Sequence, residues 1–204
     1  MLFRSSAWER RLHTPLPWSS LWPRIYGGLS TNWEADIAWR LAHGILKTRA
    51  YLTRWRRLQV SDSCSVCGQP ETFSHVFCEC SLAPDVWTWI FTLCSQFYST
   101  PLKFSPSLVL IKHGLPAGSR YLHPNALTRF LINLTLNELW AARNRHTFDG
   151  QSSTPHGVIA TIKQRVRTRI RAAYNFTSPQ DFVSSWGHAN ILCKIDNKVL
   201  RILI

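Results

Sequence analysis

Acidic residues are scarce in this 204-residue sequence: 11 Asp and Glu stand against 24 Lys and Arg, which leaves a formal net charge of +13. The acids are also scattered, and no Tyr- or Phe-x-Asp-Asp motif of a polymerase occurs. Two-metal nucleic-acid chemistry requires clustered carboxylates. We therefore expect a protein that is not an enzyme, without polymerase, RNase H or endonuclease activity of its own.

Long apolar runs are also missing. A membrane span needs roughly 18 apolar residues, and the nearest approach, VWTWIFTLC at 86–94, is much shorter. The Arg-rich start of the chain lacks the apolar stretch and the cleavage site of a secretory signal. We expect an intracellular protein of the nucleus or cytoplasm, without a membrane partner. Its thiols should stay reduced, which favours metal binding over disulfides for clustered cysteines.

Aromatic residues are abundant, with ten tryptophans, and 45% of the sequence is hydrophobic. Large aromatic side chains contribute much of the buried area of a protein, so a folded and packed chain is expected. The positive charge favours a polyanionic partner, either nucleic acid or an acidic membrane surface. Charge alone does not choose between these two.

Apolar periodicity predicts a mainly α-helical fold. Helical spacing is clearest at 32–44, 48–58, 81–98, 124–148 and 156–176, and short β segments are expected near 107–112 and 190–204. Pro- and Gly-rich stretches mark the breaks between these segments. The predicted organisation is an irregular N-terminal arm at 1–30, a domain of helices with a zinc knuckle at 31–100 (the knuckle at 60–82), a linker at 101–123, a helical basic region at 124–176 and a tail at 177–204.

Five potential metal ligands lie close together in the stretch CSVCGQPETFSHVFCEC. Cys64 and Cys67 have the Cys-x2-Cys spacing of a zinc knuckle, and His75 and Cys80 complete a tetrahedral Cys3His set. Cys78 competes for the fourth position, because a helical turn beginning near His75 cannot direct both Cys78 and Cys80 at one ion. The spacing alone leaves Cys80 modestly preferred.

The metal site is expected to be structural. Four protein ligands fill the coordination shell of zinc and leave no position for a reacting water. A small segment of this kind gains on the order of 10 kcal/mol of folding free energy from its metal. We therefore expect one structural Zn²⁺.

Two basic helical segments are candidates for contact with RNA or DNA. One precedes the knuckle, and the other lies in a stretch, 151–179, that contains no acid. Solvated faces usually mix both signs, so these segments favour binding to a phosphate backbone. Tyr51 and Trp55 lie among the first set and are expected in the core rather than stacked on bases. The predicted contact residues are Arg49, Arg54, Arg56, Arg57, Lys163, Arg165, Arg167, Arg169 and Arg171.

Several motifs together resemble a known family. They are the helix WRLAHG at 39–44, the core Cys-x2-Cys…Glu-Thr-x-x-His-x4-Cys at 64–80, and the later Leu-Trp-x-x-Arg-Asn-Arg-x-x-Phe at 139–148. Over roughly residues 30–175 the chain resembles the zinc-binding region that follows the polymerase in reverse transcriptases of LINE-type (non-LTR) retrotransposons.

The resemblance implies that Cys64, Cys67, His75 and Cys80 bind the metal, with Cys78 standing where the family often has a bulky apolar residue. It also implies a non-catalytic accessory module that holds template RNA or target DNA, with a reverse transcriptase core as a further partner. Two alternatives stay open: a zinc-stapled protein-interaction module, and a non-functional retrotransposon fragment.

Overall fold

The computed structural model describes residues 25–26, 28–56, 59, 61–98, 125–187, 190–197 and 199–204, with the backbone alone at 55 and 56. In chain order its elements are helices α3 (Asn32–Ala42) and α4 (Arg49–Arg56), the π-helical turn η1 (His75–Glu79), helices α5 (Ala83–Ser95), α7 (Ala126–Asp149), α8 (Pro155–Phe176) and α9 (Pro179–Trp186), and strands β1 (Cys193–Asp196) and β2 (Val199–Ile202). The mainly α-helical fold is confirmed.

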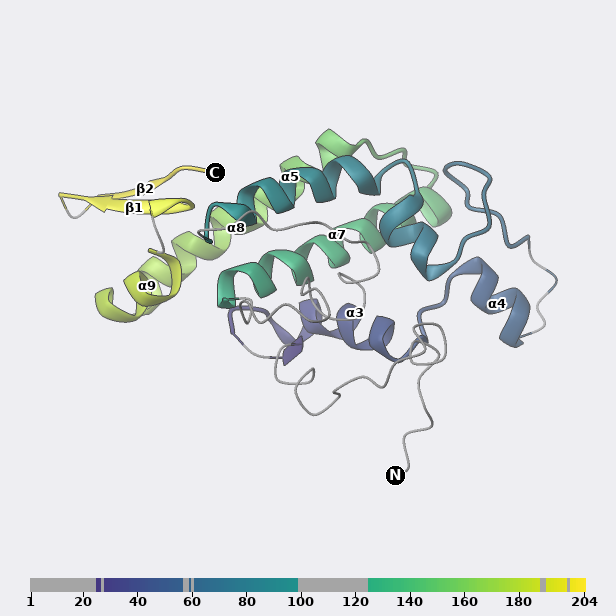
Figure 1. Ribbon diagram of the computed structural model, residues 1–204, viewed down its shortest axis with the longest axis horizontal. Helices are drawn as coiled ribbons and strands as arrows, with labels where there is room; N and C mark the ends of the chain where they lie inside the picture. Colours follow the sequence, from purple (N-terminus) through teal and green to yellow (C-terminus); the bar gives the residue numbers. More distant parts are fainter. Residues whose placement is uncertain are drawn as a thin grey trace, which may run out of the picture.

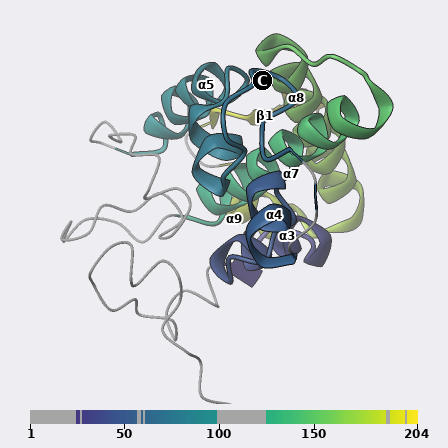
Figure 2. The same cartoon turned by 90° about the vertical axis from the view of Figure 1, so that its right-hand side faces the viewer.

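Helix α7 is the centre of the fold (Figure 1). Helix α3 packs along one side of it, and α5 and α8, which also contact each other, pack along the other. The turned view shows the same order, with α7 between α3 and the α5–α8 pair (Figure 2). Apolar residues cover most of the circumference of α7, so Leu131, Ile132 and Leu134 are all fully buried. The helix is therefore buried on more than one side.

Local sequence signals set the ends of these helices. The hydroxyl of Thr31 accepts the N–H of Glu34, and the Glu34 carboxylate accepts the N–H of Thr31, which forms a capping box at the start of α3. Asn125 and Thr154 cap α7 and α8 in the same way with their side-chain oxygens. Helix α7 ends at Gly150, whose φ of 66° is the left-handed conformation that glycine adopts without strain.

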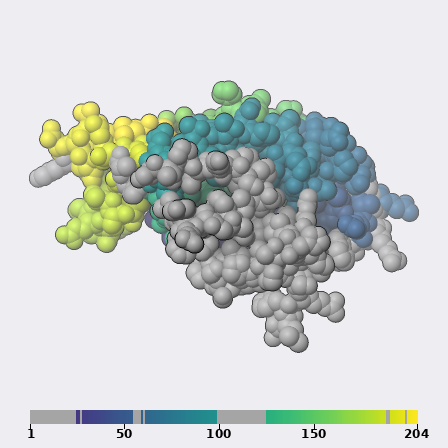
Figure 3. Space-filling model, in the orientation of Figure 1, coloured from purple at the N-terminus to yellow at the C-terminus, as the bar shows by residue number. Residues whose placement is uncertain are grey.

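The β segment expected near 190–204 is a hairpin of two strands. Strands β1 and β2 are antiparallel, with Cys193 opposite Ile202 and Asp196 opposite Val199. Asn197 provides the positive φ of the turn, at 49°. The hairpin and α9 lie at the opposite end of the molecule from α4 (Figures 1 and 3).

The predicted linker at 101–123, the expected β segment near 107–112 and most of the N-terminal arm lie outside the described residues. The described helices on the two sides of the linker share one hydrophobic core. The domain boundaries stay a prediction. None of the described helices combines the length and the apolar character that crossing a membrane requires.

Replacement of Trp87 on α5 tests the packing of the hydrophobic core. Trp87 is fully buried and donates its indole N–H to the carbonyl of Phe77 at 2.6 Å. Trp87→Ala should lower the free energy of unfolding by about 3–5 kcal/mol, because it leaves a cavity. Urea denaturation measures this loss. Trp33→Ala is the matched control, since Trp33 is 57% exposed, and its change should stay within about 1 kcal/mol. Equal losses for the two variants would contradict the packing described.

Candidate metal centre

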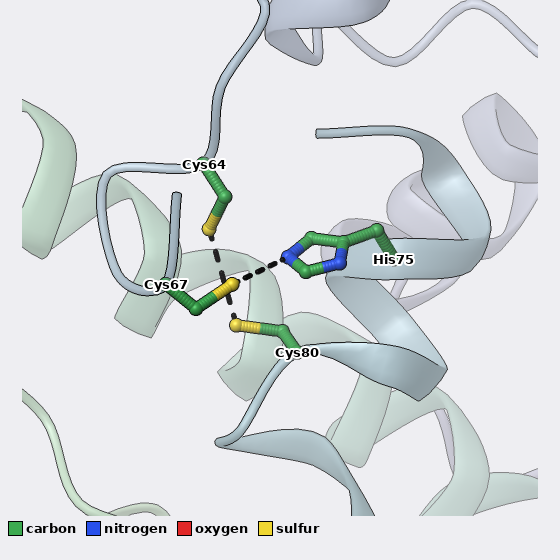
Figure 4. A group of neighbouring side chains, drawn as sticks. All are labelled: Cys64, Cys67, His75 and Cys80. Atoms are coloured by element: carbon green, nitrogen blue, oxygen red, sulfur yellow. Dashed lines mark hydrogen bonds between the residues drawn. The ribbon is translucent and has the colours of Figure 1, made fainter. Parts of the chain in front are cut away.

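The four predicted ligands meet at one point (Figure 4). The ligand atoms of Cys64, Cys67, His75 and Cys80 all lie within 4.8 Å of one another. The sulfurs of Cys64 and Cys80 are 4.0 Å apart, and the Cys67 sulfur is 3.2 Å from Nε2 of His75. A tetrahedral zinc ion with the usual bond lengths separates its ligand atoms by about 3.5–3.8 Å. The donor set and its spacing therefore fit a single zinc ion.

A tight turn brings the first two cysteines to this point. The N–H of Gly68 donates to the carbonyl of Cys64 at 2.8 Å, and the N–H of Cys64 donates to the carbonyl of Gln69 at 2.7 Å. The N–H of Val66 points at the Cys64 sulfur, 3.4 Å away. Gly68 has a φ of 76°, and a Cβ there would meet no atom within 4 Å, so the turn requires glycine for its backbone conformation rather than for space.

The other two ligands lie at the ends of the π-helical turn η1, with Cys80 directly after its last residue. The N–H of Cys80 donates to the carbonyl of His75 at 2.7 Å, a five-residue step that is one residue wider than an α-helical turn. His75 is the first residue of this turn, and its N–H donates to the hydroxyl of Thr72 at 3.1 Å. Cys78 is buried and belongs to the hydrophobic core. The structure thus brings Cys80, and not Cys78, to the ligand cluster.

The surroundings of Cys80 disfavour negative charge on its sulfur when no cation is present. The pKa of the Cys80 thiol is raised to about 12, chiefly by burial, with Cys64 and Cys67 adding to the rise and a hydrogen bond from the backbone of Leu82 opposing it. A bound cation reverses this balance, because it stabilises thiolates directly. Three thiols around one point, two of them buried and that of Cys67 exposed, are therefore suited to a metal ion.

Glu71 lies between the ligands Cys67 and His75 and is fully buried. Its Oε1 accepts the backbone N–H of Arg49 at 2.8 Å and also an N–H of the Arg143 guanidinium, while its Oε2 accepts Nε of Arg143 at 3.1 Å. The knuckle is thereby joined to α4 through Arg49 and to α7 through Arg143.

The last turns of α7 support the knuckle further. The Trp140 ring stacks on Phe77 of η1, with ring centres 6.2 Å apart. The hydroxyl of Ser65 is 3.1 Å from that of Thr147 and 3.2 Å from Nδ1 of His146. The Cys-His motif at 64–80 and the Trp-x-x-Arg motif at 140–143 therefore pack against each other. Because the two motifs lie far apart in the sequence, the sequence did not predict that they touch. The opposite charges of Glu71 and Arg143 were the one feature of the sequence that pointed to this contact.

Two of the predicted nucleic-acid contacts on α8 form ion pairs with acids of other helices. Nε of Arg165 is 2.6 Å from Oε1 of Glu138 on α7, and an N–H of Arg169 reaches Glu34 on α3 at 3.2 Å. Burial raises the pKa of the Glu138 carboxyl, and the charge of Arg165 opposes that rise. The acid-free stretch at 151–179 suggested unpaired arginines, but the paired acids come from other helices.

Two more of the α8 residues have internal contacts. Nε of Arg167 donates to the carbonyl of Ile204 at 2.9 Å, and the Lys163 ammonium lies 5.3 Å from the centre of the Trp89 ring. Arg171 is exposed, and no ion pair within the described part of the chain engages it. Much of the positive charge of α8 therefore stabilises the fold.

The basic residues before the knuckle have different surroundings. Arg54 is exposed, Arg49 is half-buried, and the side chain of Lys47 just before α4 is exposed. Among the described residues, none of these three side chains takes part in an ion pair. Tyr51 packs against Phe73 of the knuckle, with ring centres 6.3 Å apart. The side chain of Arg56 and the whole of Arg57 lie outside the described residues.

The structure is thus that of a mainly α-helical protein that contains a Cys3His cluster. Residues 6–87 match the family model described as zinc-binding in reverse transcriptase. The chain is also 25% identical over 185 residues to an uncharacterized 149 kDa protein of transposon TX1 from Xenopus laevis. That match covers 89% of this chain and 13% of the relative, so the chain spans a small part of that protein. No solved structure matches the chain significantly.

These matches confirm the resemblance to the zinc-binding region of LINE-type reverse transcriptases. Together with the ligand cluster, they support a reverse transcriptase-associated zinc-binding module. The matched segment ends at residue 87, before α7 begins, although α7 supplies the Arg143, Trp140 and Thr147 contacts of the knuckle.

Cys80→Ser should abolish binding of one zinc ion per chain, because the hydroxyl is a poor substitute for a thiolate ligand. Cys78→Ser is the matched control and should keep one zinc, since Cys78 packs in the core. Native mass spectrometry of the two variants and the unaltered protein measures the stoichiometry. Zinc retained by Cys80→Ser and lost from Cys78→Ser would overturn this ligand assignment.

Proposed function

We propose that this chain is a non-catalytic, nucleic-acid-binding module of a LINE-type reverse transcriptase. One structural zinc ion is held by Cys64, Cys67, His75 and Cys80, and the basic helix α4 binds the phosphate backbone of RNA or DNA. The observation that carries the proposal is the position of α4. The helix lies at one end of the molecule (Figure 1), and its first residue, Arg49, donates its backbone N–H to Glu71 of the knuckle.

The charge of α4 suits a polyanion. The helix contains no acid between Arg49 and Arg56, and Lys47 extends the basic surface toward α3. Neutralising backbone phosphates with such side chains releases counterions, which supplies most of the affinity of sequence-independent binding. The +13 net charge of the whole chain adds long-range attraction to the same ligand.

Helix α8 is a weaker candidate than the sequence suggested. Binding of phosphates by Arg165 or Arg169 would remove the partner of a buried carboxylate, which is strongly unfavourable. Of the five predicted α8 residues, Arg171 is the one best placed for an additional contact, because it is exposed and forms no ion pair with another described residue.

A structural role for the metal, without catalysis, agrees with the surroundings of the acids. When bound, zinc supplies a crosslink between the turn at 64–68 and η1. Glu34, Glu71 and Glu138, the three buried carboxylates among the described residues, each pair with an arginine. Paired carboxylates of this kind are poorly suited to act as general bases.

Replacing Lys47, Arg49 and Arg54 together with alanine should weaken binding to both single-stranded RNA and duplex DNA. Loss of three phosphate contacts should make the slope of log affinity against log salt shallower by about 2 for single strands and nearly 3 for duplex DNA. Filter binding at several salt concentrations measures both slopes.

The matched control replaces Arg40, Lys194 and Arg201, which lie in exposed ion pairs with Asp36 or Asp196. It removes the same number of charges away from α4 and should leave the slope nearly unchanged. Equal effects of the two triple variants would show that binding depends on the net charge of the chain and not on α4. Binding that does not respond to salt would favour the alternative of a zinc-stapled protein-interaction module.

A further inference from the structure

We infer that Glu71 is a positioning residue through which the metal centre orients α4. The inference rests on the proposed function only in taking α4 as the nucleic-acid-binding element. It concerns how that helix is held, and its first test requires no nucleic acid.

Glu71 provides two of the three acceptors at the start of α4. The first N–H groups of a helix have no partners within the helix. Here Arg49 donates to Oε1 of Glu71 at 2.8 Å, Ala50 donates to the Glu71 carbonyl at 3.3 Å, and Tyr51 donates to the hydroxyl of Thr48 at 3.3 Å. A carboxylate at this end also interacts favourably with the helix dipole.

The segment that contains Glu71 also packs against a side chain of α4. Tyr51 lies against Phe73, two residues beyond Glu71. Residues 71–73 lie between the ligands Cys67 and His75, so their path depends on both ends of the segment being held at the metal. Zinc binding therefore fixes the surface on which α4 begins.

Arg143 fixes the carboxylate from the other side. Its guanidinium binds both oxygens of Glu71 and lies 4.9 Å from the centre of the Trp140 ring on α7. A fully buried carboxylate needs such a partner to remain charged. The carboxylate is thus held by the central helix while it accepts the first N–H of α4.

The first experiment compares Glu71→Gln with Glu79→Gln in the zinc-loaded full chain. A carboxamide is neutral and has one acceptor oxygen and one donor nitrogen, so it cannot accept from Arg143 through two oxygens as the Glu71 carboxylate does. Glu79 is exposed and accepts a hydrogen bond from Ser74, which makes it the matched control. Hydrogen exchange followed by NMR measures the Arg49 and Ala50 amides, and native mass spectrometry measures zinc.

Glu71→Gln should keep one zinc ion, while the Arg49 and Ala50 amides exchange on the order of tenfold faster, because the Arg49 amide loses a charged acceptor and the side chain at 71 loses its two-oxygen contact with Arg143. Glu79→Gln should match the unaltered protein. Removal of zinc from the unaltered protein with a chelator should also speed exchange at both amides. Unchanged exchange in Glu71→Gln, loss of zinc from that variant, or unchanged exchange after chelation would each overturn the inference.

A second pair of variants decides the matter if Glu71→Gln does not fold. Arg49→Pro removes the N–H that Glu71 accepts, and proline is well tolerated at the first position of a helix. Arg49→Ala removes the same side chain but keeps the N–H. The Ala50 amide should exchange severalfold faster in Arg49→Pro than in Arg49→Ala, and equal rates would overturn the inference.

The affinity of both pairs for single-stranded RNA separates this inference from the proposed function. Weaker binding by Glu71→Gln than by Glu79→Gln, and by Arg49→Pro than by Arg49→Ala, is the expected result. If the amides respond as described and the affinities within each pair stay equal, Glu71 still positions α4, but α4 is not the nucleic-acid-binding element.

Discussion

Burial of the Glu71 carboxylate is unfavourable unless positive charge and N–H donors surround it, and the parts of the fold around the metal centre meet that requirement together. Arg143 comes from α7, the backbone N–H of Arg49 comes from α4, and the carboxylate itself comes from the segment between two metal ligands. Neither Arg143 nor the Arg49 N–H provides all the hydrogen bonds of the carboxylate alone. The metal centre, the basic helix and the central helix therefore depend on one another for a single buried charge.

The features that could be predicted from sequence are those set by neighbouring residues. Helical periodicity indicated the main helices, and the β segment expected near 190–204 lies where the tail hairpin forms. The ligand spacing indicated Cys64, Cys67 and His75 directly. The choice between Cys78 and Cys80 depended on the width of one turn, which spacing does not determine, and the family resemblance favoured Cys80 before the structure brought it to the cluster.

Charge pairing between distant helices could not be predicted in this way. The α8 segment has no acid nearby in sequence, yet Glu138 and Glu34 lie beside Arg165 and Arg169 in space. A count of local charge treats these arginines as free to bind a ligand. The same limit applies to Arg143, whose partner is 72 residues away. A count of the basic residues in one segment consequently overstates the positive surface that this segment offers to a polyanion.

The π-helical turn at His75–Glu79 has a consequence for how this segment tolerates change in length. Its hydrogen bond joins residues five apart, and these are the two ligands themselves. An α-helical turn would pair His75 with Glu79 instead, which offers no sulfur. Substitutions between the two ligands can preserve the loop, whereas insertion or deletion of one residue moves the fourth donor away from the ion. In this stretch, chain length is constrained more tightly than residue identity.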